Sequence, residues 1–130
     1  MDLTAYIQPG LSRQQNFDVQ EKHTAPHVGS GAMRVLATPW MIAFMEITAR
    51  ILLDEHLPPG HSSVGVLVNV RHLAPSALGS TVQARVAVEQ VERSLVTLAV
   101  AVWDQDEQIG SGWHERHIID VQRFLKRLDG

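Results

Sequence analysis

The sequence predicts an α+β domain in which an antiparallel sheet curves around one long helix. The stretch Thr38–Asp54 is apolar on almost every side, which is typical of a helix enclosed by the rest of its domain. Four strand-like segments follow it with short connections, and connections of that length join antiparallel strands. The 130 residues, 45% of them hydrophobic and 19% charged, have the composition of one globular domain covering residues 1–130.

Composition also excludes several classes of protein. The net charge of −3 and the lack of a lysine or arginine cluster argue against a nucleic-acid partner. Without cysteine the chain forms no disulfide and has no catalytic thiol, which fits a cytoplasmic location. The first ten residues do not read as a secretory signal, and no segment has the ~18 apolar residues needed to span a membrane. We therefore expect a soluble cytoplasmic protein with no membrane partner.

Boundary signals mark both ends of the expected helix. Thr38 is a good N-cap, and Pro39 then takes the favoured first helical position. The run Leu57–Gly60 contains two prolines and a glycine, so the helix should end near His56.

Glu46 interrupts the apolar coat of this helix. Helical spacing places it on the same face as Ile42, Ala49 and Leu53. A carboxylate in such surroundings is costly to desolvate and is rarely buried without a partner. Glu46 is therefore the first candidate functional residue. The alternative is that the helix is rotated so that Glu46 reaches solvent beside Arg50, its i+4 neighbour.

The remaining elements follow from alternation and turn signals. Strands are expected over residues 11–19, 63–73, 81–91, 95–103 and 109–119, and a short helix over residues 121–128. In the first strand after the long helix, alternation predicts one row of side chains facing that helix: Val64, Val66, Val68, Val70 and His72. Gly65 would then lie on the opposite face, where it either admits a ligand to the backbone or marks a bulge.

An antiparallel sheet wrapped around a central helix in this order is the hotdog fold. One such layer leaves a sheet edge exposed, and pairing two copies edge to edge would cover it. We therefore expect a homodimer. The strand Ser63–Leu73 is the candidate seam, because it is long and carries Leu67 on the face away from the valine row.

The segment Thr24–Ala37, between the first strand and the helix, contains Pro26, Gly29 and Gly31. Its composition predicts a loop with at most one helical turn. Two interpretations stay open: a mobile lid that closes over a site at the start of the helix, or a plain connection.

A hydroxyl, a carboxylate and an imidazole can meet where the helix faces the sheet. His72 ends the valine row, at the strand end where the rim of a cleft would lie. Together with Thr38 and Glu46 it offers a nucleophile, a base and an orienting group, within one copy or across a dimer seam. The alternatives are a structural histidine and a threonine that only caps the helix.

These residues carry a resemblance. The pattern Thr38…Glu46…Gly65…His72, followed by the run Gly-Ser-Gly-Trp-His-Glu-Arg that ends at Arg116, resembles the fluoroacetyl-CoA thioesterase family of hotdog proteins. The likeness extends from about residue 35 to residue 119, with eight residues from the threonine to the glutamate and twenty-six from there to the histidine. It implies that Thr38, Glu46 and His72 are catalytic and that Gly65 lines the acyl pocket.

The resemblance has one departure. The fluoroacetate-specific member of the family has phenylalanines in the lid before the helix, whereas Thr24–Ala37 has none. We therefore expect a lid that closes less selectively. Arg116 is the candidate contact for a CoA phosphate, and its alternative is a solvated strand charge.

Neither a metal nor another cofactor is expected. His114 and His117 point to opposite faces of a strand, so they cannot readily share a metal, and the run is not the helical HExxH pattern.

The function that the sequence predicts is hydrolysis of a small acyl-CoA, with Glu46 and His72 activating water or resolving an acyl intermediate while Thr38 positions the reacting groups. A non-catalytic acyl-thioester binding module and a hotdog enoyl-CoA hydratase or dehydratase are the alternatives.

Overall fold

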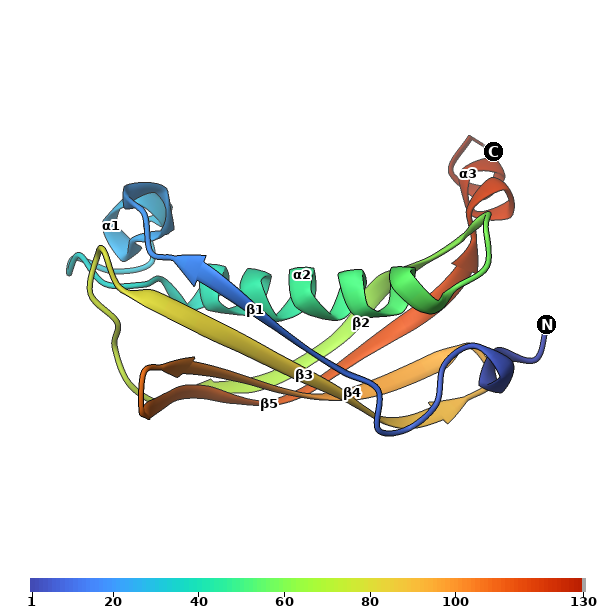
Figure 1. The fold of residues 1–130 in the computed structure, drawn as a ribbon. Helices are drawn as coiled ribbons and strands as arrows, with labels where there is room; N and C mark the ends of the chain where they lie inside the picture. The colour runs from blue at the N-terminus through green and yellow to red at the C-terminus, as the bar shows by residue number, and fades with distance from the viewer. Residues whose placement is uncertain (130) are drawn as a thin grey trace.

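In the computed structural model, which describes residues 1–129, five strands form one antiparallel sheet that curves around helix α2 (Figure 1). The strands are β1 (Ser12–Asp18), β2 (His61–His72), β3 (Thr81–Glu92), β4 (Leu95–Asp104) and β5 (Glu107–Asp120). The helices are α1 (Ala25–Val28), α2 (Thr38–His56) and α3 (Val121–Asp129), with 3-10 turns η1 (Leu3–Ala5) and η2 (Glu21–His23). The strand order is β1-β3-β4-β5-β2, so β1 and β2 are the edges. The predicted α+β hotdog fold is confirmed.

Helix α2 lies along the concave face of the sheet and buries one side of its apolar coat (Figure 1). The buried helix residues are Met41, Phe44, Met45, Thr48, Ala49, Leu52 and Leu53. They meet the alternate inward residues of two of the three interior strands: Val82, Ala84, Val86 and Val88 of β3, and Val96, Leu98, Val100 and Val102 of β4. The helix is therefore covered on one side only, and the apolar residues Ile42, Ala43 and Ile47 stay half-buried.

The two ends of α2 differ from expectation in one respect. The helix ends at His56 as predicted, before Pro58 and Pro59. At its start, however, Ala37 is the N-cap, and Thr38 is already the first helical residue. The predicted cap role of Thr38 is wrong: no side chain caps this helix, and the threonine hydroxyl has a different partner.

Strand β2 contains a bulge next to Gly65, as one of the two interpretations of that glycine predicts. Gly65 pairs with Arg116 and Leu67 pairs with Glu115, so Val66 is the extra residue between them. Before the bulge Gly65 faces α2, because a Cβ placed on it would lie 2.8 Å from a carboxylate oxygen of Glu46. The prediction that the valine row faces the helix throughout, with Gly65 pointing away, is therefore wrong on this side of the bulge.

The segment before α2 has more backbone pairing than a plain loop. Thr24 forms a β-bridge with Leu36, and Val35 forms one with Ala77 of the loop after β2. The predicted helical turn is α1, which ends at Gly29 in the left-handed conformation with φ +89°. The two ends of the segment are thus paired with each other, and its second end is also paired with the loop after β2.

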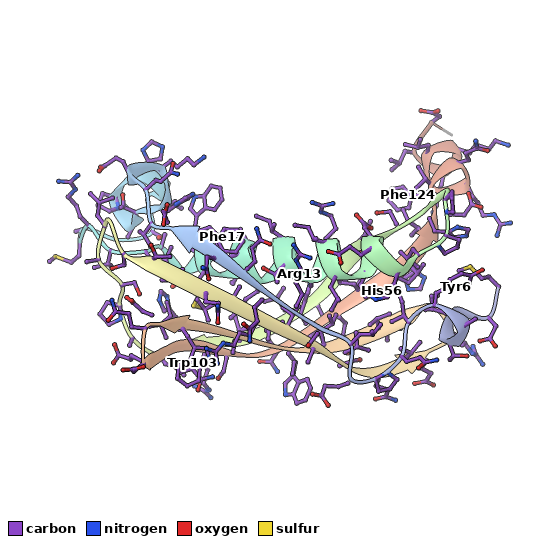
Figure 2. The ribbon with its side chains drawn as sticks, in the orientation of Figure 1. Tyr6, Arg13, Phe17, His56, Trp103 and Phe124 are labelled. Atoms are coloured by element: carbon purple, nitrogen blue, oxygen red, sulfur yellow. The ribbon has the colours of Figure 1, made fainter. Side chains whose placement is uncertain are left out.

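A cluster of aromatic rings packs β1 and η2, which precede this segment, against α2. The buried ring of His23 packs edge-on against Trp40 at 4.5 Å and Phe44 at 5.1 Å between ring centroids. Phe17 projects from β1 and stacks on Phe44 at 4.3 Å (Figure 2). Trp103, by contrast, lies on the face of the sheet that points away from α2 (Figure 2).

Within residues 1–129 no helix combines the length and apolar character that a membrane crossing requires.

Candidate functional site

The first turn of α2 and the last residue of β2 bring two predicted site residues together. Thr38 Oγ1 and His72 Nδ1 share a hydrogen bond of 2.7 Å. Burial lowers the pKa of His72 below its usual 6.5, so the ring is neutral near pH 7. The second ring nitrogen, Nε2, is buried and has no hydrogen-bond partner among the described residues. The pair thus leaves one polar atom without a partner, which is uncommon for a buried group.

Thr38 and His72 lie in the wall of a pocket of about 460 Å³. The rest of the wall comes from the segment before α2 and from the loop after β2: Ala25, Ser30, Gly31, Ala32, Met33, Val35, Leu36, Ala37, Leu73, Ala74 and Pro75. Most of these side chains are apolar. A small acyl group could therefore lie under the segment that the sequence analysis interprets as a lid.

Glu46 lies elsewhere on the same helix. Eight residues separate it from Thr38, a distance of ~12 Å along a helix. Its side chain is 42% exposed, and Oε2 lies 3.7 Å from Nη1 of Arg116. The expectation of a desolvated carboxylate is thus wrong, because Glu46 lies at the margin of the helix–sheet contact. The alternative, in which Glu46 reaches solvent, is confirmed, although Arg50 itself pairs with Asp54 at 2.9 Å.

Arg116 is buried beneath Glu46, with only 5% of its surface exposed. Its Nε donates to Ser63 Oγ at 2.8 Å, and its Nη2 donates to the Ser63 carbonyl at 3.0 Å. Burial lowers the pKa of Arg116, and the negative charge of Glu46 acts in the opposite direction. The interpretation of Arg116 as a solvated strand charge is therefore wrong.

Gly65 provides the space into which the Glu46 carboxylate fits. A Cβ on Gly65 would lie 2.8 Å from Glu46 Oε2, 3.3 Å from His114 Cε1 and 3.4 Å from Arg116 Nη1. Of the two open interpretations of this glycine, the bulge is confirmed, since Gly65 borders it. The approach of a ligand to its backbone stays a prediction.

His114 is the member of this cluster that the sequence analysis missed. It was considered only as a metal ligand, yet it is 1% exposed and lies against Gly65 and Arg116. His117 points to the other face of β5 and is exposed. The sequence contained a signal for this role. Residues 114 and 116 lie on the same face of a strand, and Arg116 was already a candidate site residue. Residues 1–129 contain no group of three side chains placed to hold a metal ion.

Within one copy the site consists of two parts. Thr38 and His72 form the first part, and Glu46, Gly65 and Arg116 form the second. The predicted set of three catalytic side chains is therefore not gathered in a single chain. A sheet that curves around one long helix with this strand order is the hotdog fold, and the family match places the chain among hotdog-fold thioesterases.

The chain belongs to the family described as fluoroacetyl-CoA-specific thioesterase, whose family model matches residues 19–122. Enzymes of this class hydrolyse acyl-CoA thioesters. The family resemblance and the thioesterase class that the sequence predicted are confirmed.

Individual relatives agree with this assignment. The fluoroacetyl-CoA thioesterase of Streptantibioticus cattleyicolor is 33% identical over 94 residues, which are 72% of this chain and 68% of the relative. A solved structure of a fluoroacetyl-CoA thioesterase is similar with a TM-score of 0.88 and 27% identity, covering 95% of this chain and 96% of its own. A hot-dog-like protein from Thermanaerovibrio acidaminovorans gives a TM-score of 0.90 and 29% identity, covering 98% and 95%.

Proposed function

We propose that the protein hydrolyses a small acyl-CoA thioester at a site shared by two copies, with Thr38 and His72 from one copy and Glu46 from the other. The observation that carries this proposal is the hydrogen-bonded Thr38–His72 pair with its unpartnered Nε2, held apart from Glu46 within the chain. Solved structures of fluoroacetyl-CoA thioesterase variants hold acetyl-CoA, or fluoroacetate with CoA, which supports a small acyl group.

The exposed edge of β2 supports the homodimer. Val66 is 54% exposed, Leu67 41% and Val68 42%, all on an edge strand whose backbone can pair with another chain. The half-buried apolar residues of α2 noted above lie on a helix that packs against this strand. A second copy would cover the open edge and these side chains together.

The same pairing would complete the site. If two copies of β2 pair antiparallel about a two-fold axis at Leu67 or Val68, His72 lies opposite residues 62–64 of the other copy. Those residues adjoin Gly65, and hence the Glu46 carboxylate. Glu46 is also 42% exposed in the isolated chain, as a group reserved for a partner or substrate would be.

The chemistry follows from the proton on His72. If Thr38 donates its hydroxyl proton to Nδ1, the neutral ring carries its own proton on Nε2, and the threonine fixes that tautomer. Nε2–H is then a donor for the thioester carbonyl oxygen, where negative charge develops during attack. Glu46 of the partner subunit accepts the proton of the attacking water, and the CoA thiolate leaves. Arg116 lies beside that carboxylate, and Gly65 leaves the space that the carboxylate occupies. Because Arg116 is buried, a direct contact between it and a CoA phosphate is less consistent with the structure.

The segment Thr24–Ala37 would cover the acyl group in the pocket beside Thr38. Because it lacks phenylalanine, we propose that the enzyme does not strongly prefer fluoroacetyl-CoA over acetyl-CoA. We also propose a cytoplasmic location, which is supported by the cysteine-free sequence.

Complementation between inactive variants tests the shared site. Glu46→Gln and His72→Ala should each abolish hydrolysis of acetyl-CoA. A heterodimer of the two, purified with two different tags, contains one intact site and should recover about half of the wild-type rate. A site contained in one chain predicts no recovery at all.

A parallel screen of acetyl-, fluoroacetyl- and crotonyl-CoA distinguishes the other functions: thiol release marks a thioesterase, loss of enoyl absorbance marks a hydratase, and binding alone marks a binding module.

A further inference from the structure

His114 is a buried imidazole to which neither the family assignment nor the proposed mechanism gives a role. Its Nδ1 lies 2.8 Å from the Leu67 carbonyl oxygen, and its Nε2 lies 3.1 Å from Arg116 Nη1. A carbonyl oxygen can only accept a hydrogen bond, and a guanidinium group can only donate one. The two partners therefore fix the ring as neutral, with its proton on Nδ1 and its lone pair on Nε2. Burial also lowers the pKa of His114.

On its donor side, His114 stabilises the bulge of β2. His114 pairs with Val68 in the β2–β5 ladder. Its side chain contacts the carbonyl oxygen of Leu67, the residue before Val68. A bulge interrupts the regular ladder and leaves backbone groups that need other partners. The imidazole supplies one such partner to the backbone of the exposed edge that we propose as the dimer seam.

On its acceptor side, His114 holds the guanidinium group that faces Glu46. Two of the donor nitrogens of Arg116, Nε and Nη2, are bound to Ser63. The third, Nη1, lies between His114 Nε2 at 3.1 Å and Glu46 Oε2 at 3.7 Å. Removing the acceptor on His114 would free Nη1 to move toward the carboxylate, and the carboxylate would move with it.

We propose that His114 is a positioning residue that links the bulged edge of β2 to the Glu46 carboxylate through Arg116. It touches no substrate; it sets where the carboxylate stands relative to Gly65 and to the seam. The effect on catalysis rests on the proposed function, whereas the hydrogen-bond link itself does not.

Two amide substitutions separate the two sides of the ring. His114→Asn keeps a donor near the position of Nδ1 and loses the acceptor for Arg116, whereas His114→Gln keeps an acceptor near the position of Nε2. With acetyl-CoA as substrate, Asn should lower kcat about tenfold or more with little change in KM, since small misplacements of a reacting group are costly. Gln should retain most of the wild-type kcat. His117→Gln, on the exposed face of the same strand, is the matched control and should leave kcat and KM unchanged.

Melting temperatures distinguish positioning from a structural role. The proposal expects Asn and Gln to melt at similar temperatures while their kcat values differ. Equal kcat values for the two variants, or losses of kcat that follow the loss of melting temperature, would overturn it.

The imidazole can also be observed without any activity. Long-range ¹H–¹⁵N spectra of the wild-type protein should show His114 neutral at pH 7, with the proton on Nδ1 and a pKa below the ordinary imidazole value of 6.5. A proton on Nε2, or a ring that titrates freely near 6.5, would refute the link whatever the rate. A wild-type protein that releases no thiol but shows the expected spectrum would instead refute the proposed function.

Discussion

Replacing Gly65 with alanine tests whether the position of the Glu46 carboxylate controls the reaction. Gly65 is not among the glycines with positive φ, so its backbone accepts alanine without conformational strain. The new methyl group, however, would lie 2.8 Å from Glu46 Oε2, whereas ordinary contact begins at 3.4 Å. The carboxylate must therefore retreat by about 0.6 Å. Because it is the end of a flexible side chain that is 42% exposed, this movement should cost little folding free energy.

The loss of activity should be much larger than the loss of stability. A 1 Å misplacement in an active site can cost about 10²-fold. By proportion, a shift of about 0.6 Å should lower kcat/KM about tenfold, which corresponds to roughly 1.4 kcal/mol of transition-state stabilisation. Thiol release from acetyl-CoA and a thermal melt of the same preparation measure the two effects.

A double variant shows whether the loss acts through Glu46. Glu46→Asp withdraws the carboxylate by one methylene, so the added methyl group meets less resistance. The Gly65→Ala/Glu46→Asp protein should therefore lose less activity than the product of the two single losses. Three outcomes would refute this reasoning. The activity losses of the two single variants could multiply in the double variant, Gly65→Ala could leave kcat/KM unchanged, or a fall in melting temperature could account for the lost activity.

Three further predictions follow from the site. Glu46→Gln should lower turnover about a hundredfold or more and barely change the melting temperature, because among residues 1–129 the one ionic contact of Glu46 is the 3.7 Å approach to a buried arginine; retained turnover would exclude it as the base. Thr38→Ser should keep most of the activity and Thr38→Ala should lose it with little change in stability, since this hydroxyl bonds to His72 rather than capping the helix; a destabilised alanine variant would contradict that. Burial lowers the pKa of His23, His72 and His114 below the unfolded value of 6.5, so the unfolded chain binds more protons than the folded one in the window just below that pH. Stability should therefore be complete above about pH 7 and decline as the pH falls through about 6, and a melting temperature that stays constant from about pH 7.5 to 5.5 would refute this.

The fold could be predicted because its strongest signals are local. The ends of α2 follow from the apolar run and from Pro58 and Pro59, which cannot continue a helix. The strands β3 and β4 have unbroken alternation and bury the side chains that the pattern predicted. The bounds Thr38–His56 are as predicted, and only the cap role of Thr38 is wrong, because the partner of its hydroxyl, His72, lies 34 residues away in the sequence.

The sequence offers a bulge only as one of two interpretations of Gly65, so the faces that the residues of β2 take on either side of it could not be predicted. Strict alternation from His72 back along β2 assigns Gly65 to the outer face, whereas the extra residue Val66 turns it toward Glu46. A valine has no property that marks such a position. The buried role of His114 depends on the same bulge, because the carbonyl that its ring contacts belongs to Leu67. Sequence spacing therefore identified the residue types of the site but not the contacts among them.

The separation of the site into two parts is a consequence of the helix itself. Thr38 and Glu46 belong to one continuous helix, and eight residues of rise keep them ~12 Å apart. Helix bending could not bring the two side chains together without breaking the backbone hydrogen bonds between them. His72 cannot bridge the distance either, because its ring is bonded to Thr38 at the far end of β2 from Gly65. The proposed reaction, which uses all three groups, therefore calls for the second chain that we propose, and the edge open to that chain is the strand that carries both His72 and Gly65.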